Sequence, residues 1–341
     1  MFYKSNDDGS GPTVIILHVD DGLVFASDVK ILYDLRDKLD ETFKGKFTWK
    51  IDEDLMTYLG MQIDRKDKCF EVTMEKFISD LLLDFKITKK KRVPANTDLF
   101  EIDKTSPSLK DDERKHMHRG VAKSLYLACR VRPDILCPVI FLCRRIKHPT
   151  RQDFSKFMNV LKYLKKTSHL GLMLGGDTNG ILHLGLYADA AHAVNQPGCE
   201  SQTGIYITLG RGAVYAKSVK QNVVARASFD SEIYALSDII PTGIFLQDFM
   251  TEVGYGNEVN PGTVYEDNMS VIHSIKKGET TSAQQRHIRI RTKFSAQFFE
   301  NGRFELIHCK TSDMIADILT KPLQGELFER LRDLILGYSK M

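Results

Sequence analysis

The sequence predicts a multidomain protein that joins an α+β part to an α/β part. Its 341 residues, of which 42% are hydrophobic and 27% charged, suffice for two or three domains with packed cores. Near the N-terminus, strand-like runs alternate with one helical stretch, and a longer helical stretch follows. The Gly-rich segment 175–180 then marks a boundary, beyond which strands are followed by covering helices, as is typical of a three-layer domain.

Residues 1–91 are predicted to form the α+β part. Its first element is a β-hairpin, because the strand-like runs 14–19 and 23–26 are joined by a turn-forming Asp-Asp-Gly tripeptide. Residues 29–43 are predicted to form a helix, since their apolar side chains recur at helical spacing. Two further strands are predicted at residues 58–63 and 69–74.

Residues 92–175 are predicted to be mainly helical after an initial linker. Pro94 and Pro107 interrupt a polar stretch, which indicates a linker or loop. From about residue 110 to residue 166, apolar residues recur at the spacing of helices that bury one face, as at Phe157 and Val160.

Residues 176–325 are predicted to form a three-layer α/β/α domain with a mixed five-stranded sheet. The five strand-like runs end at residue 187, cover 203–209 and 213–216, end at residue 265 and cover 304–308. Helices are predicted over about 229–253 and from about residues 270, 286 and 313. Residues 326–341 are predicted to form a C-terminal helix or tail.

Four acidic residues, Asp189, Glu232, Asp267 and Asp317, are the candidate catalytic and metal-binding residues of this domain. We expect Asp189 and Asp267 just past the ends of two strands, Glu232 in the first turns of a helix, and Asp317 on the last helix. Parallel neighbouring strands would bring their ends together at the functional edge of the sheet. Clustered carboxylates repel one another and require cations, and Mg²⁺ prefers oxygen ligands. The alternative to a metal site is that these four are ordinary surface acids, since the chain has 45 Asp and Glu residues from which four can be chosen.

Composition excludes several classes of protein. No run of eighteen apolar residues and no signal-like N-terminus occurs, so neither a membrane span nor a secretory signal is expected. The six cysteines are scattered without a Cys-x-x-Cys pair, which argues against a disulfide scaffold or a structural zinc site. We therefore expect an intracellular protein, cytoplasmic or nuclear, with reduced thiols and no membrane partner.

Basic residues form local clusters, although the formal net charge is only +3. Such clusters suit a phosphate backbone, and they would bind it without reading base sequence. For each cluster taken alone, a solvated surface is the simpler interpretation. The residues that we expect to contact nucleic acid are Trp49, Lys50, Lys89, Lys90, Lys91, Arg92, Arg144, Arg145, Lys162, Lys165 and Lys166.

Each of the four acids lies in a recognisable short sequence string, and further recognisable strings occur between them. They include Tyr187-Ala188-Asp189-Ala190, Ser201-Gln202-Thr203-Gly204, Ser218-Val219-Lys220-Gln221, Ser231-Glu232-Ile233-Tyr234, Tyr265-Glu266-Asp267-Asn268 and Ala316-Asp317-Ile318-Leu319-Thr320-Lys321-Pro322-Leu323. In these strings the segment 187–322 resembles the ribonuclease H domain of copia-type long-terminal-repeat retrotransposons. The resemblance implies cleavage of RNA in RNA–DNA hybrids, with the four acids as ligands of two Mg²⁺ ions, or Mn²⁺ in their place. The chain departs from the family at Ala191 and Arg289, where acidic residues are common.

Upstream strings resemble the reverse transcriptase of the same polyprotein. Leu17-His18-Val19-Asp20-Asp21 is similar to its two-aspartate hairpin, and residues 58–63 are similar to the element that follows. The resemblance covers roughly residues 10–335 and implies a partial reverse-transcriptase palm (1–91) and a helical thumb or connection (92–175). Polymerisation requires a further carboxylate on an upstream strand, so we expect Asp20 and Asp21 to form only a residual polymerase metal site.

The sequence thus predicts a truncated reverse transcriptase and ribonuclease H segment of a copia-type retrotransposon Pol polyprotein. In the parent element such a protein belongs to a virus-like particle. The expected activity is endonucleolytic cleavage of RNA in RNA–DNA hybrids, with incomplete polymerase activity. The expected partners are a hybrid or other nucleic acid and a missing upstream reverse-transcriptase segment. The alternative is a degenerate or domesticated fragment that binds nucleic acid or a partner without catalysis.

Overall fold

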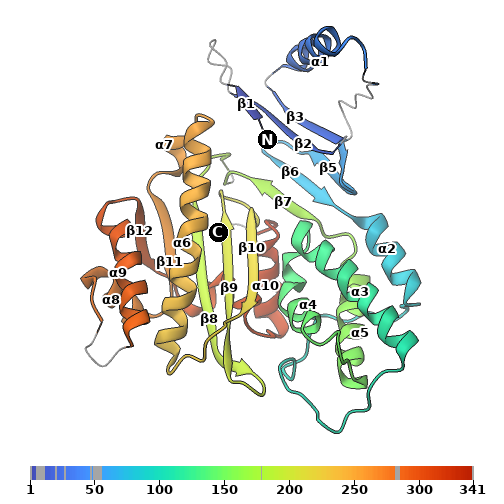
Figure 1. The fold of residues 1–341 in the computed structure, drawn as a ribbon, viewed down its shortest axis with the longest axis vertical. Coiled ribbons are helices and arrows are strands. Elements are labelled where there is room, and N and C mark those ends of the chain that lie inside the picture. Colours follow the sequence, from blue (N-terminus) through green and yellow to red (C-terminus); the bar gives the residue numbers. More distant parts are fainter. Residues whose placement is uncertain are drawn as a thin grey trace.

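The computed structural model describes residues 2–4, 12–19, 21–26, 28–46, 48, 56–177, 179–280 and 285–339 of the chain. Figure 1 shows a small N-terminal lobe at the top and a larger body that holds a five-stranded sheet and most of the helices. Within the described residues, no helix is long and apolar enough to cross a membrane.

The N-terminal lobe begins with a three-stranded antiparallel sheet. Its strands are β1 (Phe2–Lys4), β2 (Thr13–His18) and β3 (Asp21–Phe25). Pairing of His18 with Asp21 closes the hairpin and confirms its prediction. Helix α1 (Val29–Phe43) has the predicted bounds, and the side chain of Asp28 caps it by accepting a hydrogen bond from the backbone N–H of Lys30 (2.8 Å). None of its residues is buried, so α1 stands apart from the core.

A four-stranded antiparallel sheet joins the lobe to the body. Its strands, in spatial order, are β4 (Met56–Tyr58), β5 (Met61–Arg65), β6 (Cys69–Thr73) and β7 (Leu172–Gly175). The prediction of one strand over 58–63 is wrong, because Leu59 and Gly60 both have positive φ angles, 50° and 77°, and turn the chain back in a tight hairpin. Strand β7 pairs with β6 only after the chain has passed through the helical part.

The helical part lies beside these sheets on the right of Figure 1. Its elements are α2 (Glu75–Asp84), α3 (Asp111–Arg130), the 3-10 turn η1 (Pro133–Ile135), α4 (Leu136–Cys143) and α5 (Arg151–Lys166). They confirm the prediction that residues 110–166 are mostly helical, and the segment 92–107 contains neither helix nor strand, as predicted for a linker. The predicted apolar face of α5 is buried, with Phe157 and Val160 fully covered.

The mixed five-stranded sheet that the sequence predicts is present in the body. Its strands, in spatial order, are β10 (Tyr215–Lys220), β9 (Glu200–Thr208), β8 (Gly185–Asn195), β11 (Gly262–Glu266) and β12 (Phe304–His308). The first three strands are antiparallel, whereas β8, β11 and β12 are parallel neighbours. Tyr187 and Tyr265 are register partners and their rings stack 4.3 Å apart, so the condition under which Asp189 and Asp267 were expected to come close together is met.

Helices cover both faces of this sheet. The elements of the first face are α6 (Ser228–Glu252), the short α7 (Gly256–Val259), α8 (Met269–Lys277) and α9 (Arg286–Glu300). The second face packs against the helical part and against the 3-10 turn η3 (Ile315–Leu319), with α10 (Gly325–Ile335) behind η3; the exposed 3-10 turn η2 (Thr311–Asp313) precedes it. Residues alternate along β8 between the two cores: Leu186 and Ala188 face α6, and Tyr187 faces the opposite core.

The prediction of a helix from near residue 313 is wrong. The chain forms two short 3-10 turns there, and the last α-helix begins only at Gly325. Pro322 accounts for the interruption, because proline lacks a backbone N–H and disfavours the helical conformation of the residue before it. Asp317 therefore lies in η3, one turn before this proline.

Candidate active site

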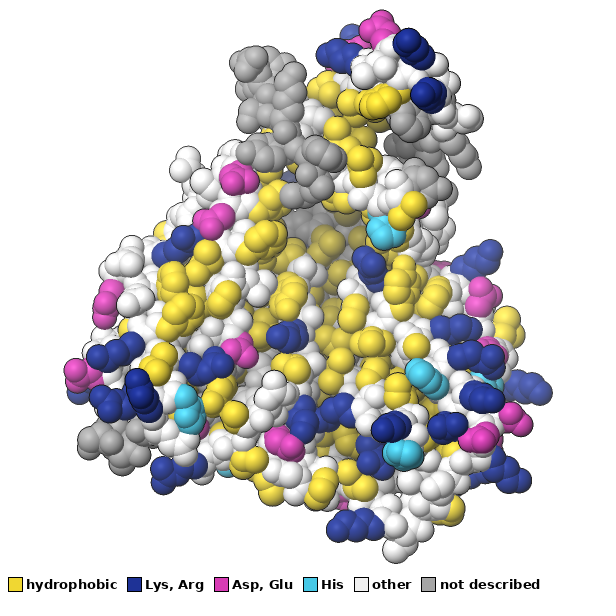
Figure 2. All heavy atoms as spheres, viewed as in Figure 1, with side chains coloured by type: hydrophobic (Ala, Val, Ile, Leu, Met, Phe, Trp, Pro, Cys, Tyr) yellow, Lys and Arg dark blue, Asp and Glu magenta, His cyan; other side chains and the backbone are white. Residues whose placement is uncertain are grey.

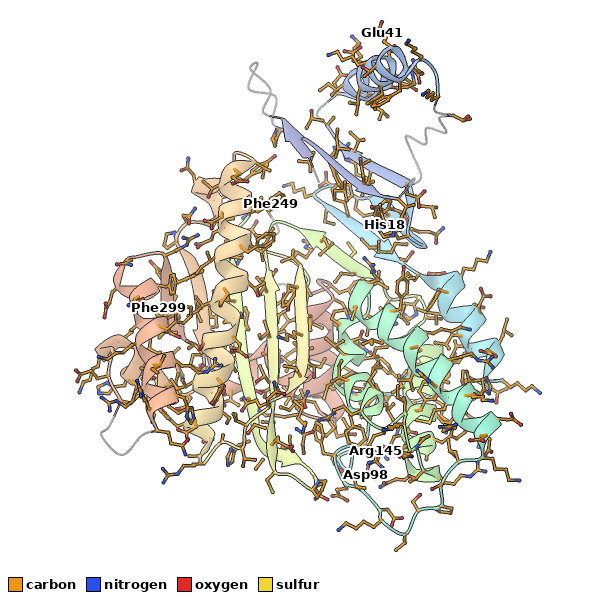
Figure 3. The ribbon with its side chains drawn as sticks, in the orientation of Figure 1. His18, Glu41, Asp98, Arg145, Phe249 and Phe299 are labelled. Carbon is orange, nitrogen blue, oxygen red and sulfur yellow. The ribbon has the colours of Figure 1, made fainter. Side chains whose placement is uncertain are left out.

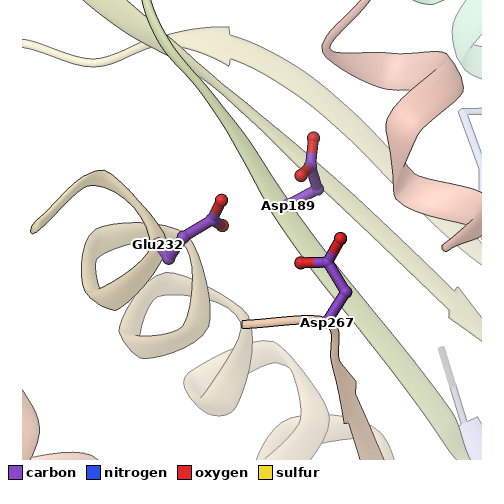
Figure 4. A group of neighbouring side chains, drawn as sticks. All are labelled: Asp189, Glu232 and Asp267. Carbon is purple, nitrogen blue, oxygen red and sulfur yellow. The ribbon is translucent and has the colours of Figure 1, made fainter. Parts of the chain in front are cut away.

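Asp189, Glu232 and Asp267 come together where β8 and β11 separate. Each offers one carboxylate oxygen, and these atoms all lie within 4.8 Å of one another. Figure 4 shows the three side chains converging from β8, from the first turns of α6 and from the end of β11. Asp267 directly follows β11 as predicted, but Asp189 lies within β8 and not past its end. Pairing of β8 with β11 stops at Tyr187, so Asp189 still follows the point where the parallel strands part.

The Asp189 side chain is 2% exposed and lies against the turn that carries Asp317. The hydroxyl of Thr320 donates a hydrogen bond to Oδ2 of Asp189, and Nζ of Lys321 lies 3.4 Å from Oδ1. Gly204 pairs with Asp189 on the neighbouring strand. A Cβ atom there would lie 2.7 Å from the backbone oxygen of Ala316, so glycine is required for η3 to pack this closely on β9.

Glu232 is held in place by a buried amide. Nε2 of Gln221 donates to the backbone oxygen of Ser231 (3.0 Å) and to Oγ1 of Thr203 (2.9 Å). These two hydrogen bonds fasten the start of α6 to β9. They also give a structural reason for three of the strings, because 218–221 carries the amide of Gln221, and 201–204 and 231–234 carry its partners Thr203 and Ser231.

Burial raises the pKa of two glutamates in this cluster well above the ordinary range. For Glu232, the negative charges of Asp189, Glu266 and Asp267 raise the pKa further. For Glu266, the backbone N–H of Asn268 donates to Oε1 (3.0 Å) and partly offsets the effect of burial on the pKa. The Oε2 atom of each glutamate is buried without a hydrogen-bond partner among the described residues. Both carboxyl groups therefore lie in an environment that a cation would stabilise.

Asp317 lies next to the three converging acids and pairs with a lysine. Nζ of Lys321 lies 2.6 Å from Oδ1 of Asp317. Burial and the charge of Asp189 together raise the pKa of Asp317 to about 7, against the opposing effect of Lys321. The turn itself is anchored to β10, because Oγ of Ser218 donates to the backbone oxygen of Leu319 (2.6 Å).

Glu266 and Lys321 are the site residues that sequence reasoning missed. Glu266 shares its face of β11 with the buried Val264, so the alternation of the strand was a signal that this acid is buried. Lys321 follows Asp317 by four residues, a spacing that allows an ion pair within one helical turn. Both residues lie inside strings that the sequence already singled out.

The hairpin acids lie elsewhere. Asp21 is exposed at the start of β3, and Asp20 lies outside the described residues. His18, the register partner of Asp21, lies in the N-terminal lobe in Figure 3, apart from the five-stranded sheet. The structure therefore does not bring Asp21 to the three converging acids.

The fold joins two basic clusters that are distant in the sequence. The backbone N–H of Lys91 donates to the backbone oxygen of Lys162 (3.1 Å), so the segment 89–92 lies along the end of α5 that carries Lys165 and Lys166. Arg92 forms a bidentate pair with Glu329 on α10 (2.7 and 2.8 Å). Lys89, Lys90, Lys165 and Lys166 are exposed.

The remaining predicted contact residues lie apart from this cluster or outside the described residues. Arg144 is exposed at the end of α4, and Arg145 next to it pairs with the buried carboxylate of Asp153 (3.0 Å). Figure 3 places Arg145 near the lower end of the helical part. Trp49 and Lys50 lie outside the described residues.

Comparison with curated proteins finds retrotransposon polyproteins. The chain is 26% identical over 325 residues to the retrovirus-related Pol polyprotein from transposon RE1 of Arabidopsis thaliana. The aligned region covers 94% of this chain and 21% of the relative. It is 26% identical over 336 residues to the Pol polyprotein from transposon TNT 1-94 of Nicotiana tabacum, covering 96% of this chain and 24% of the relative. The chain thus spans about a fifth to a quarter of the length of the curated relatives it matches.

Comparison with solved structures finds likenesses of low TM-score, and no family model matches the chain. The ribonuclease H1 of Halobacterium salinarum is 15% identical, with 40% of this chain and 94% of that chain covered and a TM-score of 0.29. A complex of LC11-RNase H1 with an RNA/DNA hybrid is 14% identical, with 40% and 93% covered and a TM-score of 0.30. The fold class, mixed α/β, is therefore assigned from the strand order and pairing of the five-stranded sheet and not from these TM-scores.

Proposed function

We propose that this chain, which corresponds over most of its length to a segment of a copia/Ty1-type retrotransposon Pol polyprotein, is an endonuclease that cleaves the RNA strand of RNA–DNA hybrids. The observation that carries the proposal is the convergence of Asp189, Glu232 and Asp267 within 4.8 Å at the point where two parallel strands separate. Residues 176–325 would form the ribonuclease H-like domain that holds this site.

The side chains fit a hard divalent cation such as Mg²⁺, or Mn²⁺ in its place. All the converging donors are carboxylate oxygens, which Mg²⁺ prefers. Asp189 and Glu232 are buried, whereas Asp267 is half-buried, so the cluster remains open to solvent on one side. When bound, a pair of such ions activates a water molecule and stabilises the leaving oxygen of a phosphodiester displacement.

In this proposal, each residue of the site either holds an ion or orients a carboxylate that does. Asp189, Glu232 and Asp267 would hold one ion, and Asp317 together with Asp189 would hold the second. The hydroxyl of Thr320 orients Asp189 by its hydrogen bond to Oδ2. Gln221 orients Glu232 through the backbone of Ser231. Because these supporting groups are buried and hydrogen-bonded, the carboxylates would keep their positions before any ion arrives.

Exposed basic side chains would hold the hybrid by its phosphates. Figure 2 shows Lys and Arg side chains gathered over the helical part of the molecule. The residues best placed for this role are Lys89, Lys90, Arg144, Lys165 and Lys166, which are all exposed. Arg92 and Arg145 are engaged in ion pairs within the chain, and binding of a phosphate would compete with those pairs.

By the same likeness to Pol polyproteins, residues 1–91 would be a partial reverse-transcriptase palm and residues 92–175 a thumb or connection. Residues 326–341 would be a C-terminal helix or tail. We propose no polymerase activity for this chain alone. Asp21 lies on an exposed hairpin, and a polymerase site would require carboxylates from a further reverse-transcriptase segment.

Incubation of the purified chain with a labelled RNA–DNA hybrid and Mg²⁺ tests the ribonuclease proposal. We expect cleavage of the RNA strand by the wild type and none by Asp267→Asn or Glu232→Gln. Glu252→Gln is the matched control, because this glutamate is exposed at the end of α6, and it should cleave like the wild type. Equal cleavage by wild type and Asp267→Asn, or no cleavage by either, would contradict the proposal. Binding of the hybrid without cleavage would favour the non-catalytic alternative.

A further inference from the structure

We propose that the ammonium group of Lys321 occupies the place of a second divalent cation between Asp189 and Asp317, so that a second ion binds only by displacing it. The proposal rests on the function proposed above. It makes the two ion positions unequal, because Lys321 makes its shorter ion pair with Asp317, which is a ligand of the second ion alone, and only its longer one with Asp189, which both ions share. Lys321 is then a positioning residue that sets the metal requirement of the site.

The geometry of Lys321 carries this inference. Its Nζ lies 2.6 Å from Oδ1 of Asp317 and 3.4 Å from Oδ1 of Asp189. One cation between two buried carboxylates is the arrangement that oxygen ligands form around a divalent ion. Asp317 is not among the three acids whose oxygens lie within 4.8 Å of one another. The acids therefore divide into a group of three and a lysine-bound pair, and Asp189 belongs to both.

The backbone fixes the position from which Lys321 reaches these acids. Its N–H donates to the backbone oxygen of Asp317 (2.9 Å), which places the two side chains one turn apart. Pro322 follows directly and restricts the backbone of Lys321. The preceding Leu319 is tied to β10 through Ser218. Since the side chain is 36% exposed, it can turn outward without movement of the backbone.

The charges make the lysine a competitor of the second ion. A divalent ion between Asp189 and Asp317 would lie against the ammonium group, and like charges at such a distance repel strongly in a buried site. The ammonium group must therefore leave its ion pair before the ion can bind. The barrier is lower for the first ion, because Glu232 and Asp267 have no ion pair with a basic side chain among the described residues and Asp189 makes only the longer of the two Lys321 contacts (3.4 Å against 2.6 Å). We expect the displacement to weaken binding of the second ion about tenfold.

Titration of the metal-free full-length chain with Mn²⁺, followed by electron paramagnetic resonance and calorimetry, tests the proposal without RNA or DNA. The wild type should bind one ion tightly and a second ion about tenfold more weakly. In Lys321→Met the second ion should bind about tenfold more tightly than in the wild type, with the first unchanged. Lys293→Met, on the exposed side of α9, is the matched control and should titrate like the wild type.

The outcomes separate this inference from the proposed function. Unchanged or weaker binding of the second ion by Lys321→Met would overturn the competition. Lys321→Gln keeps a polar side chain and must give the same gain, so that a folding defect of one variant does not decide the result. Two equal ion sites in a wild-type chain that cleaves the hybrid would refute only the role of Lys321. A wild-type chain that binds no ion would refute both proposals.

Discussion

Two buried groups of charged residues in this chain differ in how their charges are balanced. In the helical part, the fully buried Arg132 donates from Nε and Nη2 to the two carboxylate oxygens of Asp134 (2.9 and 2.8 Å). The hydroxyl of Tyr163 also donates to Asp134, and Nη1 and Nη2 of Arg132 donate to Thr167. The charges of Arg132 and Asp134 thus compensate each other, and both side chains also have neutral hydrogen-bond partners.

The cluster at the five-stranded sheet is unbalanced by comparison. Its acids are Asp189, Glu232, Glu266, Asp267 and Asp317. Lys321 pairs with two of them, and two buried carboxylate oxygens have no partner among the described residues. A satisfied buried pair holds a fold together, whereas an excess of buried charge of one sign persists where a ligand compensates it. The difference indicates structure in the first region and function in the second.

Breaking the balanced group should have the largest effect on stability. Arg132→Met leaves the carboxylate of Asp134 buried without its cation, and we expect the free energy of unfolding to fall by about 3–5 kcal/mol. Urea denaturation followed by circular dichroism measures this. The double variant Arg132→Met/Asp134→Leu removes both charges and should recover most of the loss. If the double variant is no more stable than the single one, the balance of charge is not what stabilises this region.

Removing one acid from the unbalanced cluster should increase the free energy of unfolding, whereas breaking the balanced group decreases it. Glu232→Gln takes a buried negative charge away from three acidic neighbours, so the free energy of unfolding without metal should rise by about 1–2 kcal/mol near pH 8. The same denaturation assay in EDTA measures the change, with Glu252→Gln as the exposed control. A loss of stability in Glu232→Gln would mean that the carboxylate has a structural partner.

The pH dependence of stability should report the same imbalance. Burial and the charge of Asp189 raise the pKa of Asp317 from 3.8 to about 7. An acid with a raised pKa binds more protons in the folded chain than in the unfolded chain, so its contribution to stability falls as the pH rises. This contribution is complete below the unfolded pKa and is lost as the pH passes through about 7.

Thermal denaturation between pH 4 and pH 8 in EDTA and in Mg²⁺ checks this prediction. The metal-free wild type should lose stability as the pH rises, and Asp317→Asn should lose less because it no longer titrates. Mg²⁺ should reduce the loss in the wild type, since a bound cation favours the charged carboxylate. Identical slopes in the wild type and in Asp317→Asn would argue against a raised pKa at this position.

An exposed ion pair should show the smallest effect. Arg92 and Glu329 join the linker to α10 at 2.7 Å, but the arginine is exposed to solvent. We expect Arg92→Met to lower the free energy of unfolding only slightly and by less than any of the changes above, because water and salt screen such pairs. A larger loss in urea denaturation would show that this contact is needed to hold α10 in place.

Two of the long helices were predictable from local sequence. The helix expected over 29–43 is α1, and the helix expected over 229–253 is α6 (Ser228–Glu252). Besides the end of β8, which lies beyond Asp189, two errors arose at backbone turns and at a proline. Leu59 and Gly60 turn a strand-like run into a hairpin, and Pro322 limits the region around Asp317 to 3-10 turns.

The sequence by itself determined which acids to consider, because Asp189, Glu232, Asp267 and Asp317 each lie in a specific local string. The tertiary structure decided which side chains surround them and how their charges are compensated. It buried Glu266 in the cluster and placed Lys321 between Asp189 and Asp317. The alternation of β11 and the spacing of Asp317 and Lys321 are local signals. The approach of Lys321 to Asp189 and of the acids to one another joins residues that are distant along the chain, so no local pattern specifies it.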